Sequence, residues 1–325
     1  MKQMPGPMLL EPVGKDYIWG GVRLKTEYNK SGCTQIPLAE TWECSVHPDG
    51  PSRISTGIFE GMTLNAVLQE HPEYLGTKIS DNKLPILVKF IDAAQKLSVQ
   101  VHPGDEYARV HEGQNGKTEM WYVLDAVPGA TLIYGFAHNI TERQLRDAVR
   151  TGNLSKHLQK IKVRKGDVFY IPAGTIHAIG AGTVIAEIQE SSNVTYRVYD
   201  YGRKDKTGKP RETHLDKAVD VLDMNAAPEI VQHSRLTRFY PGCARQLLCR
   251  CKYFDVERVE VNGNFGFSVL DTSFQVLLCL DGAGDITSYA SKESIGFSKG
   301  SCIFMPADTG RCTIYGKTEL LKIRC

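Results

Sequence analysis

The 325-residue chain contains no long uninterrupted apolar run and no surplus of either charge. A membrane-spanning helix needs roughly 18 or more apolar residues in succession, so we expect no contact with a membrane. Lys and Arg number 39 and Asp and Glu 37, a formal charge of +2, without the clustered basic face of a nucleic-acid-binding protein. Residues 1–13 carry prolines and no signal-peptide pattern, which predicts a cytoplasmic protein.

Regularly spaced cysteines are also missing. The nine cysteines form an odd count without a repeated spacing, so the sequence predicts no disulfide framework. Cys249 and Cys251 stand two residues apart, and we interpret them as small buried apolar residues in a reducing compartment. Hydrophobic residues make up 42% and charged residues 23% of the chain, as in ordinary globular proteins, and the length suffices for two domains.

Side chains of metal-binding type are present between residues 97 and 177. The block L-S-V-Q-V-H-P places Gln100 and His102 two residues apart, and such residues in a strand point to the same face. Glu119 opens an apolar strand, and His177 follows a turn that contains Gly and Pro. Imidazole, carboxylate and amide oxygen form a suitable ligand set for Zn²⁺ and leave a coordination position for water or substrate.

The second half of this stretch has a long and fixed spacing. A lone Q-x-H is more often structural than metal-binding, but residues 166–177 read G-D-x4-P-x-G-x2-H. This pattern resembles the second motif of the cupin superfamily, whose small β-barrels hold a metal between such strands. Gln100 replaces the first of the two usual histidines and Glu119 lies unusually far downstream. In both features the chain resembles the type I mannose-6-phosphate isomerases (phosphomannose isomerases).

Further blocks carry the same resemblance over most of the chain, from about residue 15 to residue 205. They are W-G-G at 19–21, A-E-T-W-E at 39–43, K-T-E-M-W at 117–121 and the segment 187–197. The length is similar to that of the short bacterial branch of the family, which lacks the large helical domain of the long enzymes.

The resemblance implies a mainly β fold of two cupin-like jelly-roll barrels, a bicupin with a helical insertion in the first barrel. Thr141 and Gln144 form a capping-box pattern, and apolar positions continue to Ile161. We therefore predict that a long helical segment over residues 139–160 is this insertion. Residues 84–92 and 97–101 predict a β-hairpin that leads into the first metal-binding block.

The last hundred residues are similar to a degenerate copy of the first barrel. Residues 300–306 repeat the G-x5-P spacing of residues 166–172. Arg311 stands at the position that corresponds to His177, and Gln275 stands where Glu119 would be. The fold is thus expected to be repeated without the metal ligands.

The similarity between the two parts of the chain predicts two domains. We expect a catalytic metal-binding domain over residues 1–225 and a C-terminal β domain without metal ligands over residues 226–325. The second domain would have a structural or dimerising role, in a chain that is a monomer or a homodimer.

The resemblance implies a reversible isomerisation of mannose 6-phosphate and fructose 6-phosphate through an enediol. One Zn²⁺ per chain would be held by Gln100, His102, Glu119 and His177. The neutral amide of Gln100 leaves the centre with net positive charge, which favours a developing enediolate.

Three residues are candidates for catalysis. Arg197 is similar to the active-site arginine of the family and would stabilise the charge of the enediolate. Lys117 shares a strand face with Glu119 and would be a companion cation. Glu187 is expected in the polar interior of the barrel, where it is our candidate for the base that moves the proton.

The resemblance assigns fewer residues to binding of the small-molecule substrate than to catalysis. Ser98 matches a family position near the phosphate, whereas the cation that holds the phosphate is unassigned, with Arg203 and Lys204 as candidates. Two other functions stay open. An iron-dependent dioxygenase of the cupin type would prefer histidine at Gln100, whereas a non-catalytic sugar-phosphate-binding protein could keep every ligand.

Overall fold

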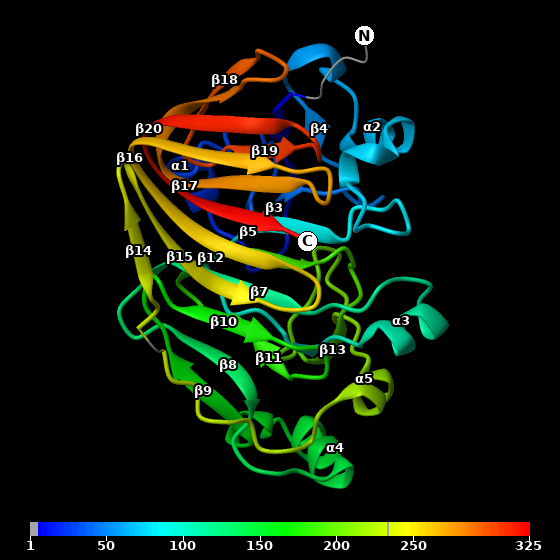
Figure 1. Ribbon diagram of the computed structural model, residues 1–325. Coiled ribbons are helices and arrows are strands. Elements are labelled where there is room, and N and C mark those ends of the chain that lie inside the picture. The colour runs from blue at the N-terminus through cyan, green and yellow to red at the C-terminus, as the bar shows by residue number, and fades with distance from the viewer. Residues whose placement is uncertain (1–5, 233) are drawn as a thin grey trace.

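The computed structural model describes residues 6–232 and 234–325, and its fold is mainly β (Figure 1). The strands form three antiparallel sheets, and the α-helices are short. Within the described ranges none of the sheets closes on itself. Because strands predominate and the helices are short, the prediction of a mainly β fold is confirmed.

The six-stranded sheet lies in the middle of the molecule (Figure 1). Across the sheet its strands are β10 (Val168–Ile171), β7 (Glu119–Ala126), β12 (Thr183–Glu190), β5 (Ile86–Ala93), β3 (Glu40–Cys44) and β2 (Val13–Lys15). Every residue of β5 and β12 is buried, because both faces of this sheet are covered. On one face Met120 and Tyr122 join an apolar core with residues of the nine-stranded sheet, and on the other Trp121 packs with Leu132 of the five-stranded sheet.

The nine-stranded sheet contains most of the C-terminal third. Its strands are, in order, β14 (Thr237–Tyr240), β15 (Cys243–Arg250), β16 (Asp255–Val269), β20 (Gly310–Arg324), β17 (Gln275–Ser288), β19 (Cys302–Met305), β1 (Met8–Glu11) and β4 (Arg53–Ile54), while β18 (Ser294–Ser298) pairs with β17. Two N-terminal strands thus complete a C-terminal sheet. In register, Met8 of β1 lies opposite Phe304 of β19.

The five-stranded sheet carries two of the metal-binding blocks. Its strands are β13 (Tyr196–Tyr199), β6 (Val99–Val101), β11 (His177–Ala178), β8 (Thr131–Phe136) and β9 (Leu158–Lys162). Since β5 belongs to the six-stranded sheet and β6 to this one, the predicted hairpin of residues 84–92 and 97–101 is wrong. The chain instead crosses from one sheet to the other between them.

The helices lie outside the sheets, with α3, α4 and α5 along one side of the lower half in Figure 1. The α-helices are α1 (Arg23–Glu27), α2 (Leu64–Glu70), α3 (Asp105–His111), α4 (Glu142–Arg150) and α5 (Leu215–Val221), and the 3₁₀ turns are η1 (Gly57–Phe59), η2 (Pro72–Leu75) and η3 (Leu154–Lys156).

The long helix predicted over residues 139–160 is wrong in extent. The capping box of Thr141 and Gln144 is present and starts α4. The helix ends at Arg150, and Gly152 follows with a φ of 72°, a left-handed conformation that glycine adopts without steric cost. The apolar residues Leu158 and Ile161 belong to strand β9 instead.

The two larger sheets share a strand order. In the six-stranded sheet β7 lies between β10 and β12, and in the nine-stranded sheet β17 lies between β19 and β20. The register agrees as well, because Glu119 at the start of β7 lies opposite Ile171, and Gln275 at the start of β17 lies opposite Met305. Gln275 therefore occupies in the second sheet the position of Glu119 in the first.

Candidate active site

Three of the predicted ligands meet at one point between the sheets. His102 follows β6, Glu119 begins β7 and His177 begins β11. One candidate ligand atom from each residue lies within 4.8 Å of the others, and each residue is at most 1% exposed. His102 Nε2 lies 3.2 Å from Glu119 Oε1, and His177 Nε2 lies 3.8 Å from Glu119 Oε2.

The fourth predicted ligand joins this cluster. Gln100 on β6 lies opposite His177 on β11, and Gln100 Nε2 is 3.4 Å from His177 Nε2. Ser98 Oγ in turn lies 3.4 Å from Gln100 Oε1. The sheet register thus brings together side chains that are far apart in the sequence.

Backbone carbonyl groups orient both imidazole rings. His102 Nδ1 lies 2.8 Å from the carbonyl oxygen of Val194, and His177 Nδ1 lies 2.8 Å from that of Thr175. Each Nδ1 therefore carries the proton, and each Nε2 presents a lone pair to the shared point. Burial lowers the pKa of His102 to about 3, with a further contribution from Lys117, and burial also lowers the pKa of His177. Both rings are neutral at pH 7, as metal ligation requires.

A carboxylate without a full set of partners completes the cluster. Glu119 Oε1 is buried and accepts no hydrogen bond of suitable geometry from the described residues, although Lys117 Nζ forms an ion pair with it at 2.8 Å. Burial opposes ionisation of Glu119, but Lys117, His102 and His177 together outweigh it and hold the pKa of Glu119 well below its usual range. Lys117 Nζ also lies 3.2 Å from His102 Nε2. An ammonium group thus contacts the same donor atoms, and these residues fit a divalent cation.

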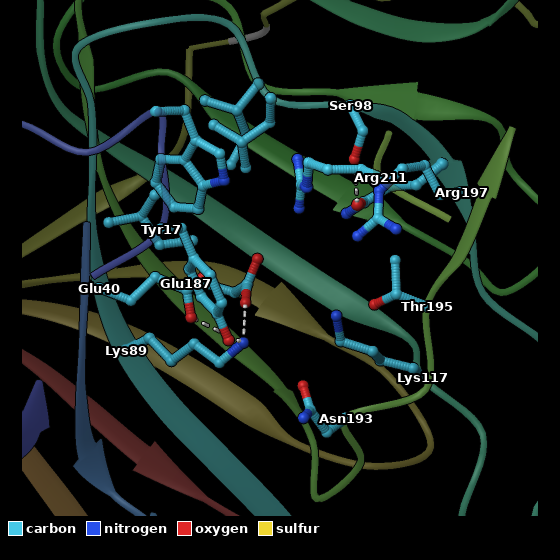
Figure 2. Close-up of a pocket in the computed structure, with 15 residues that line it drawn as sticks. Tyr17, Glu40, Lys89, Ser98, Lys117, Glu187, Asn193, Thr195, Arg197 and Arg211 are labelled. Carbon is cyan, nitrogen blue, oxygen red and sulfur yellow. Dashed lines mark hydrogen bonds and ion pairs between the residues drawn. The ribbon is translucent and has the colours of Figure 1, made fainter. Parts of the chain in front are cut away.

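A cavity of about 260 Å³ opens beside the cluster (Figure 2). Each of the predicted catalytic and substrate-binding residues Ser98, Lys117, Glu187 and Arg197 lines it, as does Gln100. Figure 2 shows two polar groups on opposite sides of the cavity, one around Glu187 and one around Arg197.

The group around Glu187 contains two residues that sequence reasoning missed, Lys89 and Glu40. Lys89 Nζ lies 3.1 Å from Glu187 and 3.6 Å from Glu40. The indole nitrogens of Trp121 and Trp42 donate to Glu187 and Glu40, each at 2.8 Å. Burial raises the pKa of Glu187, and the charge of Glu119 acts in the same direction. The sequence feature that could have identified Lys89 is the presence of a lysine within the continuous apolar run of β5.

The group around Arg197 includes Arg211, a further residue that sequence reasoning missed. Arg197 donates from Nη1 to the carbonyl oxygen of Glu212 at 2.6 Å, while its buried Nε has no partner among the described residues. Arg211 lines the cavity and pairs with Asp200 at 3.2 Å. Two arginines therefore make this side of the cavity suited to an anion.

The two candidate cations for the phosphate, Arg203 and Lys204, do not line this cavity. Arg203 donates from Nη1 to the carbonyl oxygen of Lys96 at 2.7 Å and pairs with Asp200. The cavity lining contains Arg211 but neither Arg203 nor Lys204.

Comparison with known proteins places the chain in a family. The type I phosphomannose isomerase catalytic domain matches residues 8–126, and the mannose-6-phosphate isomerase cupin domain matches residues 245–325. Over 322 residues the chain is 37% identical to mannose-6-phosphate isomerase ManA of Bacillus subtilis, covering 97% of this chain and 98% of that protein. The chain belongs to the type I phosphomannose isomerase family. It is therefore an enzyme of the isomerase class, which confirms that prediction.

Further relatives match this isomerase in sequence or structure along nearly its whole length. The mannose-6-phosphate isomerase of Streptococcus mutans is 36% identical over 322 residues, covering 98% of each chain. The crystal structure of the mannose 6-phosphate isomerase from Bacillus subtilis matches with a TM-score of 0.91 and 33% identity, covering 98% of this chain and 99% of that one. No helix in the described part of this isomerase is long and apolar enough to cross a membrane.

Proposed function

We propose that this isomerase interconverts mannose 6-phosphate and fructose 6-phosphate, and that Gln100, His102, Glu119 and His177 hold one Zn²⁺ for the reaction. The observation that carries the proposal is the convergence of two neutral imidazoles and a buried carboxylate beside a polar cavity. Nitrogen and carboxylate ligands suit Zn²⁺. When bound, the ion would polarise the oxygens on the two carbons between which the carbonyl group moves.

The residues around the cavity supply the proton transfer. Isomerisation requires a base to take a proton from one carbon and return it to its neighbour. Glu187 is our candidate, because its raised pKa brings the carboxylate closer to neutral pH, where it can both accept and release a proton. Lys89 and Trp121 fix its two oxygens. Glu187 therefore has a defined position when substrate enters.

The cationic side of the cavity would bind and orient the substrate. Lys117 and Arg197 face the space next to the metal ligands and would stabilise negative charge on the sugar oxygens. Arg211 and Ser98 would hold the phosphate. We propose Arg211 for this role in place of Arg203 and Lys204, because only Arg211 of these three contributes to the cavity lining.

We also propose the bicupin organisation, with a metal-binding domain over residues 1–225 and a C-terminal domain over residues 226–325. The shared strand order and register of the two larger sheets support it. The first domain contributes β1 and β4 to the sheet of the second. A cytoplasmic location and a monomeric or homodimeric state remain predictions.

A coupled assay with mannose 6-phosphate tests the function. We expect activity that disappears after chelation, returns with Zn²⁺ and accompanies about one metal ion per chain in elemental analysis. His102→Ala and His177→Ala should lose both metal and activity while keeping the circular dichroism of the folded protein. His157→Ala is the matched control, because His157 is a half-buried histidine outside the cluster that pairs with His138 instead. Unchanged turnover by the chelated protein would contradict the metal assignment, and a metal-loaded protein without turnover would favour a binding protein.

A further inference from the structure

Residues 203–211 form a small hairpin between β13 and α5, and Arg211 lines the cavity from its second leg. The backbone N–H of Asp205 donates to the carbonyl oxygen of Lys209 at 2.8 Å. The carboxylate of Asp205 closes the turn, because it accepts hydrogen bonds from the backbone N–H groups of Thr207 and Lys209. The hairpin is therefore held together by its own contacts.

Asp200 holds both legs of this hairpin. It directly follows β13 and is 5% exposed. Its carboxylate pairs with Arg203 on the first leg, and both of its oxygens accept from Arg211 Nη1 on the second, each at 3.2 Å. In the backbone, Arg203 N–H donates to the carbonyl oxygen of Asp200 at 3.0 Å, and Arg211 N–H donates to that of Arg203 at 3.2 Å. One buried carboxylate thus fixes the direction in which the Arg211 side chain leaves the hairpin.

The guanidinium group of Arg211 keeps donors for a ligand. Asp200 uses only Nη1, whereas Nε and Nη2 have no acceptor among residues 6–232 and 234–325. Both atoms are accessible, unlike the buried Nε of Arg197. They lie on one edge of the planar group, and such an edge matches two oxygens of a phosphate.

Three arginines share the negative charge of Asp200. Burial lowers the pKa of Arg197, the charges of Arg211 and Arg203 act in the same direction, and Asp200 opposes them. One carboxylate against three guanidinium groups leaves an excess of positive charge, which suits the dianion of a phosphate monoester. The charge of Asp200 by itself opposes binding of an anion, so a favourable effect on binding has to come from the position in which it holds Arg211.

We propose that Asp200 is a positioning residue that directs Arg211 to the substrate phosphate and thereby makes the enzyme selective for phosphorylated sugars. The inference rests on the proposed function and extends it from Arg211 to the residue that orients it. Asp200 is not part of the cavity lining, so it acts through Arg211 and not on the sugar.

The tip of the hairpin has a weaker anchor. Lys206 pairs with Asp16, which precedes Tyr17 on the opposite side of the cavity (Figure 2). The side chains of this pair are 52% and 51% exposed, so solvent screens the interaction. The contacts of Asp200 at the base therefore determine where Arg211 lies.

Steady-state kinetics of the purified full-length enzyme with Asp200→Asn test this role. We expect the KM for mannose 6-phosphate to rise roughly tenfold with kcat changed less than about twofold, because a misdirected guanidinium loses one charge-assisted hydrogen bond. The inhibition constant of inorganic phosphate should rise in parallel. A role of Asp200 as a counter-charge alone predicts the opposite sign, because the substitution removes a negative charge beside an anion site. A lower or unchanged KM would overturn the proposal.

Two control variants separate this effect from loss of an ion pair in general. Asp216→Asn should leave KM unchanged, because Asp216 also pairs with an arginine, Arg146 at 2.7 Å, but is 91% exposed and outside the cavity lining. Lys206→Met removes the contact at the tip and should change KM by less than about twofold. A larger effect of Lys206→Met than of Asp200→Asn would contradict the assignment of the base as the anchor.

A double variant tests whether Asp200 acts through Arg211. The KM of Asp200→Asn combined with Arg211→Gln should equal that of Arg211→Gln alone, whereas increases that multiply would contradict the proposal. Arg211→Lys gives an answer even if Asp200→Asn does not fold. It keeps the charge but not the planar pairing, so KM should rise nearly as far as in Arg211→Gln, and a KM near that of the parent would overturn the proposal.

Failure of the proposed function has a different signature. A parent enzyme that does not turn over mannose 6-phosphate would refute that function. Calorimetric titration of the parent and of Asp200→Asn with inorganic phosphate would then still decide the role of Asp200, because weaker binding by the variant supports it and equal or tighter binding overturns it.

Discussion

Lys89 offers a direct test of the buried ion network beside the cavity. Lys89→Met keeps most of the side-chain volume but removes the ammonium that lies 3.1 Å from Glu187 and 3.6 Å from Glu40. Removing one partner of a buried ion pair costs about 3–5 kcal/mol of unfolding free energy. Trp121 and Trp42 still donate to the two carboxylates, so we expect a loss near the lower end, about 3 kcal/mol.

Urea denaturation of the chelated protein at pH 7 measures this loss without a contribution from metal. Lys217→Met is the matched control, because Lys217 pairs with Glu112 at 2.7 Å but its side chain is 48% exposed. Such exposed pairs contribute about 0.2–1 kcal/mol.

The pH dependence of the loss has a definite sign. Burial already raises the folded-state pKa of Glu187, and without Lys89 that pKa rises further above its unfolded value. The resulting penalty is present at neutral pH and disappears as the pH falls below the unfolded pKa, roughly 4.3 for glutamate. The difference between variant and parent should therefore shrink between pH 7 and pH 4. A deficit at pH 7 no larger than that of Lys217→Met would refute the reasoning.

Three further measurements address other parts of the molecule. Arg211→Gln should raise the KM for mannose 6-phosphate about 10–100-fold, because it removes one charge-assisted hydrogen bond to the phosphate. Arg203→Gln should raise the KM less in the same steady-state assay. Burial raises the pKa of Glu190 to about 7 from 4.5, so stability should fall as the pH rises between these values. Glu190→Gln should flatten that slope in denaturant titrations and stabilise the protein at pH 8 by up to about 3 kcal/mol; an unchanged slope would contradict this. Thr141→Ala removes the cap of α4 and should cost about 1 kcal/mol of unfolding free energy without changing kcat.

The metal-ligand cluster was predictable because the sequence blocks that carry its four ligands resemble those of a known family. The period of a strand places Gln100 and His102 near one another, and a short turn leads to His177 at the start of another strand. The network of Lys89, Glu40 and Glu187 was not predictable in the same way. It depends on which strands become neighbours across a sheet, and a single sequence does not contain that information.

The two errors in secondary structure have a related cause. Apolar residues at 154, 158 and 161 fit a helical period, but Leu158 and Ile161 lie in a strand that packs beside β8. Likewise, two apolar runs joined by a short turn fit a hairpin, but here they enter different sheets. Local patterns do not distinguish these alternatives, because tertiary pairing decides between them.

The pairing of β1 with β19 has a consequence for biosynthesis. Met8 of β1 finds its partner at Phe304 of β19, so β1 leaves the ribosome long before the strand with which it pairs. Until then its backbone groups and those of the C-terminal sheet edge are free to pair with other chains. This sheet is therefore completed only after β19 has been synthesised, and prematurely ended chains would be prone to aggregate.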